Sequence, residues 1–281
     1  MRYKIINEAK FGEHELMAGK VLAVANEKGG VGKTTCSVQL ALELAELGFK
    51  VCLVDNDPSG DATTALCGNK VPTVICQGNR PEATANTIKL YSKDSEFEPL
   101  EISKNLSLLG ATDALSLLKG ADMEPAYDFC DSLDMLREAY DFVLIDCPPS
   151  FGLLFTAAML GCISGGVVVP VIPDDLSFKA AKKVKNRIDQ MNDRMHLGLQ
   201  IVGVLANKVV NNPMPQSVKH YLSKLKEEFG DIALDTHINQ TVKISDAIAL
   251  QEKVSNYAKK SSKPAKQITA VTKEILTKLE S

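Results

Sequence analysis

The sequence predicts an α/β fold: a doubly wound, mostly parallel sheet flanked by helices. Short apolar runs alternate along the chain with segments of helical periodicity, the order that a parallel sheet requires. Several runs, such as residues 166–171, lack polar alternation, as expected of central strands covered on both faces. The predicted strands lie at 21–25, 51–54, 106–109, 142–145, 167–171 and 201–205.

The predicted helices show apolar residues at three- and four-residue spacing. The clearest pattern follows the first strand, at Val38, Ala41, Leu42 and Ala45. Between residues 68 and 104 the periodicity weakens, and we expect loops and short helices packed onto the core.

The last helical pattern places apolar side chains on one face. These are Ile268, Val271, Ile275 and Leu279. Two interpretations compete: docking against the core, or binding to a membrane as an amphipathic helix. The segment lacks Trp and Phe and is only modestly basic, which favours docking.

Length and composition are consistent with one large domain. The chain has 281 residues, of which 45% are hydrophobic; we expect a short N-terminal extension, 1–20, and a single domain, 21–281. No apolar run approaches the ~20 residues that span a bilayer, and residues 1–20 lack the order of a signal peptide. The seven cysteines form no C-x-x-C pair. We therefore predict a cytoplasmic protein with reduced cysteines.

Charge is distributed unevenly along the chain. Residues 1–175 hold 14 Lys and Arg against 25 Asp and Glu, whereas residues 176–226 hold 10 against 2. Residues 227–281 are balanced at 8 against 8. The basic middle block predicts attraction to a polyanion.

A glycine-rich segment follows the first strand and opens the first helix. Glycines let backbone N–H groups close around phosphate oxygens, and a helix N-terminus adds positive dipole. Lys33 is placed to reach the β- and γ-phosphates, and Thr34 to offer a hydroxyl to Mg²⁺. The segment therefore predicts a nucleoside triphosphate site. Its candidate binding residues are Lys28, Gly29, Gly30, Val31, Gly32, Lys33, Thr34 and Thr35.

This segment departs from the usual P-loop pattern, Gly-x-x-x-x-Gly-Lys-[Ser/Thr]. Glu27 stands at the first glycine position, and a second lysine, Lys28, precedes the double glycine. The segment resembles the deviant Walker-A signature of the ParA/MinD ATPases, Lys-Gly-Gly-x-Gly-Lys-[Ser/Thr]. Two further family blocks follow in order, at 51–58 and 140–150, and the resemblance spans roughly residues 20–279. It implies a P-loop NTPase that uses ATP and Mg²⁺.

Each of these two blocks ends an apolar strand with an aspartate, Asp55 or Asp146. Ligands of an open α/β sheet sit at the carboxyl ends of its strands. Because Mg²⁺ keeps several waters and takes few protein ligands, we expect Asp146 to hold it through water, with Asp55 and Thr34 close to the metal.

The resemblance implies two catalytic roles besides that of Lys33. Asp57, the second aspartate of the Asp-x-Asp-Pro block, would orient or polarise the attacking water. Lys28 would reach across a dimer interface to the phosphates of the partner's ATP and neutralise transition-state charge. The alternatives are a turn carboxylate beside Pro58 and a solvated loop lysine.

The resemblance also implies an adenine contact. Asn207 follows the strand at 201–205, where family members place an asparagine that hydrogen-bonds the base. Family members commonly carry Pro-Arg where this chain has Asn239 and Gln240, so the base pocket differs there.

Nonspecific binding to duplex DNA requires Lys and Arg directed at phosphates. Three candidates, Lys219, Lys224 and Lys226, lie on the helical pattern after Pro215, and Lys243 occupies the position of a family DNA-contacting arginine. Residues 179–187 form a second basic helix, for which a solvated face is the alternative.

Together these features predict a ParA-type partition ATPase. An ATP-dependent homodimer would bind nucleoid DNA, and a ParB-like centromere-binding partner would stimulate its weak hydrolysis and so position a plasmid or chromosome. The alternatives are a membrane-associated MinD-like positioning ATPase and an electron-transfer ATPase resembling nitrogenase iron protein, which needs cluster-bridging cysteines.

Overall fold

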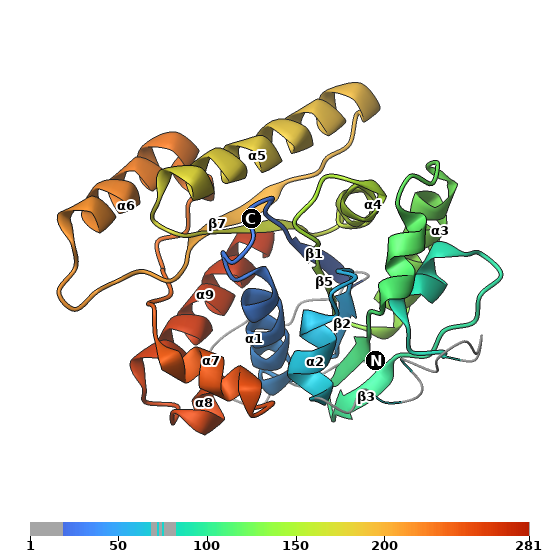
Figure 1. Cartoon of the computed structure of the whole chain (residues 1–281), viewed down its shortest axis with the longest axis horizontal. Coiled ribbons are helices and arrows are strands. Elements are labelled where there is room, and N and C mark those ends of the chain that lie inside the picture. Colours follow the sequence, from blue (N-terminus) through green and yellow to red (C-terminus); the bar gives the residue numbers. More distant parts are fainter. Residues whose placement is uncertain (1–18, 69–71, 73–74, 76–82, 281) are drawn as a thin grey trace.

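A computed structural model describes residues 19–68, 72, 75 and 83–280. Most of the predicted extension 1–20, part of the segment expected to hold loops and short helices, and Cys76 therefore lie outside the described residues. The described chain forms a seven-stranded sheet in the order β3-β4-β2-β5-β1-β6-β7 (Figure 1). Its strands are β1 (Lys20–Val24), β2 (Val51–Asp55), β3 (Leu100–Ser103), β4 (Leu106–Leu109), β5 (Phe142–Asp146), β6 (Gly166–Val171) and β7 (Ile201–Ala206).

The sheet is parallel except at one edge. β1 pairs in parallel with β5 and β6, β2 with β4 and β5, and β6 with β7. Among the described strands, β3 alone runs antiparallel, in a hairpin with β4. The predicted doubly wound α/β fold is confirmed.

Strand β3 was not predicted. Its four residues alternate half-buried and exposed positions, and it pairs with β4 at the edge of the sheet. So short a run, directly after Pro99, is a weak signal in a sequence, because an edge strand need not be apolar on both faces.

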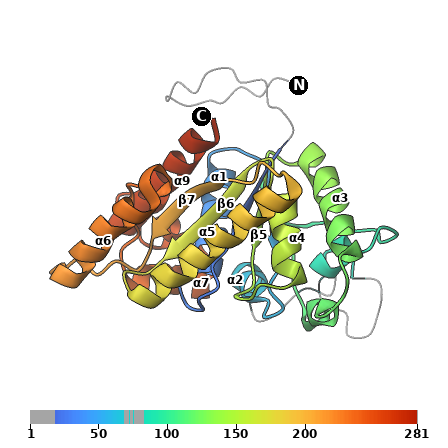
Figure 2. The same ribbon diagram turned by 90° about the horizontal axis from the view of Figure 1, so that it is seen from above.

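Helices cover both faces of the sheet (Figure 2). Residues of α3, α4, α5 and α6 form one apolar cluster with the sheet, and residues of α1, α2, α7 and α9 form the other. The α-helices are α1 (Lys33–Glu46), α2 (Asp61–Cys67), α3 (Glu124–Ala139), α4 (Leu153–Gly161), α5 (Asp175–Met195), α6 (Gln216–Phe229), α7 (Val242–Ala249), α8 (Val254–Tyr257) and α9 (Lys263–Glu280). Short 3₁₀ turns occur at η1 (Thr87–Tyr91), η2 (Asp113–Leu118) and η3 (Gly230–Ile232).

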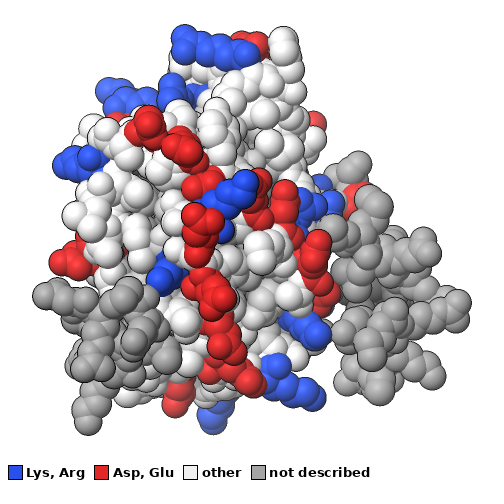
Figure 3. Space-filling model, turned by 90° about the vertical axis from the view of Figure 1, so that its right-hand side faces the viewer, with Lys and Arg blue, Asp and Glu red and all other residues white. Residues whose placement is uncertain are grey.

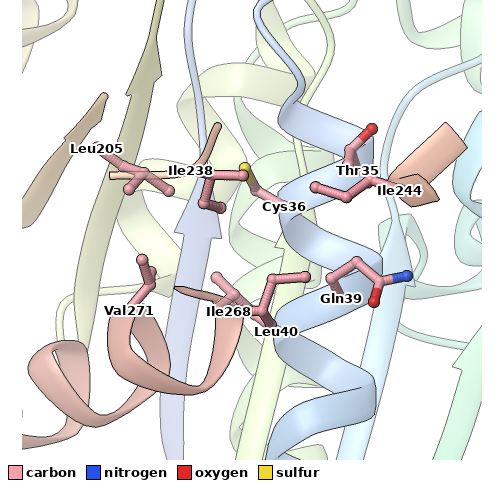
Figure 4. Close-up of a pocket in the computed structure, with 9 residues that line it drawn as sticks. All are labelled: Thr35, Cys36, Gln39, Leu40, Leu205, Ile238, Ile244, Ile268 and Val271. Atoms are coloured by element: carbon pink, nitrogen blue, oxygen red, sulfur yellow. The ribbon is translucent and has the colours of Figure 1, made fainter. Parts of the chain in front are cut away.

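The C-terminal helix α9 docks on the core, as predicted. Ile268, Val271 and Ile275 are buried against the sheet, and the Thr269 hydroxyl donates to Glu43 of α1 over 2.8 Å. A cavity of only about 10 Å³ remains between α9, β7 and α1. Leu205, Ile238, Ile268 and Val271 line it opposite Cys36 and Leu40 (Figure 4). The helix that follows the glycine-rich loop therefore rests on a closely packed apolar support.

An ionic cluster, in which Lys253 and Glu43 are buried and Glu46 is exposed, joins the C-terminal half of α1 to the C-terminal helices. Lys253, whose side chain is 7% exposed, forms ion pairs with Glu43, at 2.6 Å, and with Glu46. Lys260 reaches Glu46 from the exposed side at 2.5 Å. We call Lys253, Glu43 and Glu46 the α1 ion cluster.

The described cysteines carry free thiols, and Cys36, Cys52, Cys147 and Cys162 are buried. Burial raises the pKa of Cys36 to about 12. These four behave as small core residues, in line with the prediction. Among the described helices, none is both long and apolar enough to cross a membrane.

Candidate active site

The glycine-rich loop lies at the carboxyl end of β1 and leads directly into α1. Gly30 (φ 76°) and Gly32 (φ 95°) adopt left-handed backbone conformations, which favour glycine. At Gly32 a side chain is also excluded by space, because a Cβ atom would lie 2.3 Å from Nδ2 of Asn207. Only glycine, which has no side chain, thus fits this position of the turn.

Neighbouring strands hold the loop through its carbonyl groups. The Asn207 side chain, at the end of β7, donates to the carbonyl of Val31 over 2.8 Å. Lys208 donates to the carbonyl of Gly30, also over 2.8 Å. Asn26 donates to the Pro170 carbonyl of β6 over 2.7 Å and accepts from the N–H of Lys28.

In the described structure, most N–H groups of the loop have no acceptor. Within the described residues, no group accepts a hydrogen bond from the N–H of Gly29, Gly30, Val31, Gly32 or Lys33. Gly29 and Gly30 are exposed, whereas Lys33 is only 7% exposed. Successive free N–H groups at a helix N-terminus, beside a buried ammonium, form an anion-binding concavity.

Asp146 ends β5 next to this loop. Its Oδ1 accepts a hydrogen bond from Ser37 of α1 over 2.9 Å, whereas its Oδ2 is buried without a partner among the described residues. Burial and the neighbouring Asp55 raise the pKa of Asp146 to about 8, although hydrogen bonds from Thr34 and Ser37 oppose the shift. The hydrogen bonds therefore offset only part of the cost of burying a charged Asp146 carboxylate.

Asp55 lies beside Asp146 because β2 and β5 pair in register at these two residues. Its Oδ2 accepts from the N–H and the hydroxyl of Thr63, over 2.7 and 2.6 Å. Burial raises its pKa to about 6 despite these hydrogen bonds. The two buried carboxylates thus repel each other, and a cation between or beside them would relieve that repulsion.

The oxygen donors at this site fit Mg²⁺, with the protein supplying only a few of its ligands. The site offers the partnerless Asp146 oxygen, Asp55 and the Thr34 hydroxyl, all hard oxygen donors. In the described part of the chain, no three His, Cys, Asp or Glu residues gather into a metal cluster. Water and phosphate oxygens would have to complete the coordination, as is usual for Mg²⁺.

Asp57 follows in a half-buried turn after β2. Its Oδ1 accepts from the N–H of Ser59 over 3.0 Å, so part of the carboxylate does act as a turn acceptor. Its other oxygen has no hydrogen bond within the described residues, and stays available to a water molecule. The predicted role in hydrolysis remains a prediction.

Lys28 is held within its own chain. Its ammonium contacts both oxygens of Asp174, at 2.8 and 2.7 Å. Asp174 also caps α5 by accepting from the N–H of Ser177. Partial burial raises the pKa of Asp174, but the hydrogen bonds from Lys28 and Ser177 outweigh it and lower the pKa overall. Lys28 is therefore not merely a solvated loop residue.

Asn207 is 3% exposed and lies against the loop. Its side chain contacts the loop backbone, which gives it a positioning role separate from the predicted adenine contact. Asn239 donates its N–H to Gln267 of α9 over 3.2 Å, so this stretch is tied to the C-terminal helix.

Three residues of the site were not predicted from the sequence. Asp174 lies beyond the carboxyl end of β6, the same signal that identified Asp55 and Asp146. Ser37 stands one helical turn after Lys33 and reaches Asp146 from the same face. Thr63, which fixes Asp55, carries no such signal, because the loop before α2 determines its position.

The candidate DNA-contacting lysines fall into two groups. Lys219 and Lys243 are exposed and form no ion pair within the described residues. Lys224 lies 3.5 Å from Asp175, and Lys226 pairs with Asp235.

The second basic helix, α5, is also largely paired with carboxylates. Lys182 contacts Glu228 at 2.9 Å, and Lys183 contacts Glu27 at 2.8 Å. Lys185 contacts Asp189 of the same helix at 2.6 Å. The charge of the basic block is thus substantially neutralised within the fold.

Comparisons with known proteins agree with this architecture. A family model described as an AAA domain matches residues 19–201. The chain is similar to the sporulation initiation inhibitor protein Soj of Bacillus subtilis, at 31% identity over 235 residues, covering 82% of this chain and 87% of Soj. It is 28% identical to the chromosome partitioning protein ParA of Caulobacter vibrioides strain NA1000, with coverage of 85% and 87%.

The fold is also that of a solved nucleotide complex. The structure of an ATP complex of a Cyanothece McdA variant superimposes with a TM-score of 0.79, covering 92% of this chain and 97% of McdA at 18% identity. At that identity the likeness concerns the fold alone. The family match and the two sequence relatives, together with the loop and the paired aspartates, show that this chain belongs to the ParA/MinD family of P-loop ATPases.

Proposed function

We propose that this protein is a ParA-type partition ATPase that binds ATP and Mg²⁺, dimerises on ATP and binds duplex DNA without sequence preference. Two observations on the described residues carry the proposal: the N–H groups from Gly29 to Lys33 have no acceptor there, and one buried oxygen of Asp146 has no partner there. The first feature suits a triphosphate, and the second suits its metal ion.

Each group of site residues has a separate role in ATP hydrolysis. The loop N–H groups and Thr35 hold the triphosphate, and Lys33 supplies a buried positive charge to its phosphates. Thr34, Asp55 and Asp146 would hold Mg²⁺, which neutralises phosphate charge when bound. Asp57 orients the attacking water with its free oxygen.

Lys28 serves the partner's ATP in the proposed dimer. To reach across the interface its ammonium must first leave Asp174, so the contact within the chain competes with dimer formation. The side chains of this pair are 25% and 37% exposed, so it is worth no more than about 1 kcal/mol.

Replacing Asp174 by asparagine is expected to favour the ATP-bound dimer about two- to fivefold, the range that the loss of a partly exposed ion pair allows. Asparagine still caps α5, because its side-chain oxygen accepts from Ser177, but it lacks the charge that holds Lys28. The measurement is the protein concentration at half-dimerisation in ATP, by light scattering. Asp175→Asn is the matched control, since Asp175 pairs with Lys224 instead. Weaker dimerisation of Asp174→Asn would show that Asp174 supports the interface.

Replacing Asp146 by asparagine is expected to stabilise the metal-free protein while weakening Mg²⁺-dependent ATP binding. The raised pKa means that the folded protein retains a proton that the unfolded chain releases, so Asp146 lowers stability as pH rises from about 4 to 8. The variant should gain about 1–3 kcal/mol in unfolding free energy at pH 8, and less at pH 5. Urea denaturation in EDTA at both pH values measures this; an equal gain at both would contradict the charge explanation.

DNA binding is proposed from Lys219 and Lys243, whose ammonium groups are unpaired in the described structure. A ParB-like partner would raise the weak intrinsic hydrolysis rate, and the ATP-bound dimer would reside in the cytoplasm on the nucleoid. The buried apolar face of α9 leaves no support for membrane attachment through that helix.

The test is binding to random-sequence duplex DNA with ATP, with ADP and without nucleotide, over a salt series. Binding that requires ATP and weakens linearly in log salt is the expected result. Equal binding in all three nucleotide states would contradict an ATP-controlled partition protein.

A further inference from the structure

A shallow pocket of about 470 Å³ lies between the loop that precedes α7 and the first turns of α9. It is open to solvent. The polar and basic residues that line it include Thr236, His237, Ser261, Lys263, Lys266 and Gln267. We call it the C-terminal pocket.

The two lysines of the C-terminal pocket are exposed and form no ion pair within the described residues. Asp235 also lines the pocket, but its carboxylate pairs with Lys226. Glu274, farther along α9, accepts hydrogen bonds from the N–H groups of Asp235 and Thr236, over 2.6 and 3.0 Å. Asp235 is thus paired with a lysine outside the pocket, and the Glu274 carboxylate is engaged by backbone N–H groups. Among the described residues, no carboxylate pairs with Lys263 or Lys266, which leaves both available to an external anion.

Backbone and neighbouring groups add to this charge. The pocket includes the N-terminus of α9, whose 18 residues contribute a positive dipole. Burial and the charge of Lys263 lower the pKa of His237, although a hydrogen bond with Asn239 opposes the shift. The lowered pKa favours the neutral ring, which carries one N–H donor. The C-terminal pocket therefore offers the donors and field that a phosphate group needs.

The distribution of charge over the rest of the molecule also favours the C-terminal pocket as the site for a polyanion. The lysines of α5 and α6 are mostly paired with carboxylates, although they dominate the sequence count. On the side of the molecule where α3 lies, Asp and Glu form a nearly continuous band (Figure 3). Helix α3 itself exposes Glu124, Asp131, Asp134 and Glu138. A polyanion is repelled from that side.

We propose that the C-terminal pocket takes a backbone phosphate of duplex DNA, with Lys263 and Lys266 as its charged contacts. This rests on the proposed function and names a DNA-facing site outside the basic block. The N–H of Asn239, just before the helix that carries Lys243, donates to Gln267, which lines the pocket. The occupant is a phosphodiester backbone, because an open pocket beside unpaired lysines has no enclosing walls for a small ligand.

The test compares fluorescent duplexes of random sequence, each about two helical turns long, bound by the parent and by K263Q/K266Q, both in ATP. The double variant should lose at least about tenfold in affinity near 0.1 M salt, and its log–log salt slope should fall by about 2. K182Q/K185Q removes the same charge from paired lysines of α5 and should change affinity less than about threefold. K263R/K266R should restore binding, and intrinsic ATP hydrolysis should stay unchanged throughout.

The outcomes separate this inference from the proposed function. If the parent binds DNA in ATP but K263Q/K266Q keeps its affinity and slope, the pocket is not a phosphate site and the partition function stands. An equal loss in K182Q/K185Q would overturn the pocket too, because net charge alone would explain it. A parent that binds no DNA in any nucleotide state would overturn both.

Discussion

Replacing Asp57 by alanine is expected to lower ATP turnover by about 10²–10³-fold while leaving ATP bound. One oxygen of this carboxylate accepts from Ser59, and the other has no hydrogen bond in the described structure. The free oxygen can position a water for attack, and alanine removes it without touching the loop that holds the phosphates. Nucleotide affinity by calorimetry and phosphate release together measure the separation of binding from chemistry.

Two further variants sharpen that result. Lys33→Ala should lose nucleotide itself, because it removes the buried charge at the start of α1. Asp61→Ala removes a nearby exposed carboxylate from the first turn of α2 and should hydrolyse ATP within about threefold of the parent. If Asp57→Ala hydrolysed ATP at the parental rate, Asp57 would be only a turn residue.

Replacing Lys253 by methionine is expected to lower the free energy of unfolding by about 3–5 kcal/mol. The change leaves the buried Glu43, which is 5% exposed, and the exposed Glu46 without the buried cation that pairs with both. The lost ammonium also joins α1 to the turn before α8, so the C-terminal helices should loosen together with the helix of the glycine-rich loop. Urea denaturation at pH 7 measures the loss.

Lys260→Met is the matched control, because Lys260 contacts the same Glu46 from an exposed position. Its unfolding midpoint should stay close to that of the parent, since exposed ion pairs contribute little. Equal midpoint shifts in the two variants would contradict the assignment of stability to the α1 ion cluster.

The parallel strands and the glycine-rich loop were predictable because their physics is local. A fully buried strand must be apolar along its length, and a phosphate loop needs glycine where φ is positive, as at Gly30 and Gly32. The edge strand β3 and the position of Thr63 were not predictable, because neighbouring segments distant in sequence determine them.

Charge was the property that sequence described least well. A count of residues 176–226 gives a strongly basic block, but it cannot show that Lys182 and Lys183 pair with carboxylates from distant segments. Nor does it show that Lys226 pairs with Asp235, just beyond the block. Conversely, the balanced count of residues 227–281 conceals Lys263 and Lys266, which are unpaired in the described structure. Long-range ion pairs, such as Lys28 with Asp174, depend on the tertiary fold and leave no spacing signal.

The most direct test of the central claim is the molar mass of the Asp57→Ala protein in solution with Mg²⁺, by light scattering, in ATP and in ADP. The variant should hold ATP without consuming it, so the proposed dimer can accumulate. The mass should rise from 30.4 kDa to about twice that value in ATP and stay at the monomer value in ADP. A protein that binds ATP yet remains at 30.4 kDa would contradict an ATPase that acts through an ATP-bound dimer.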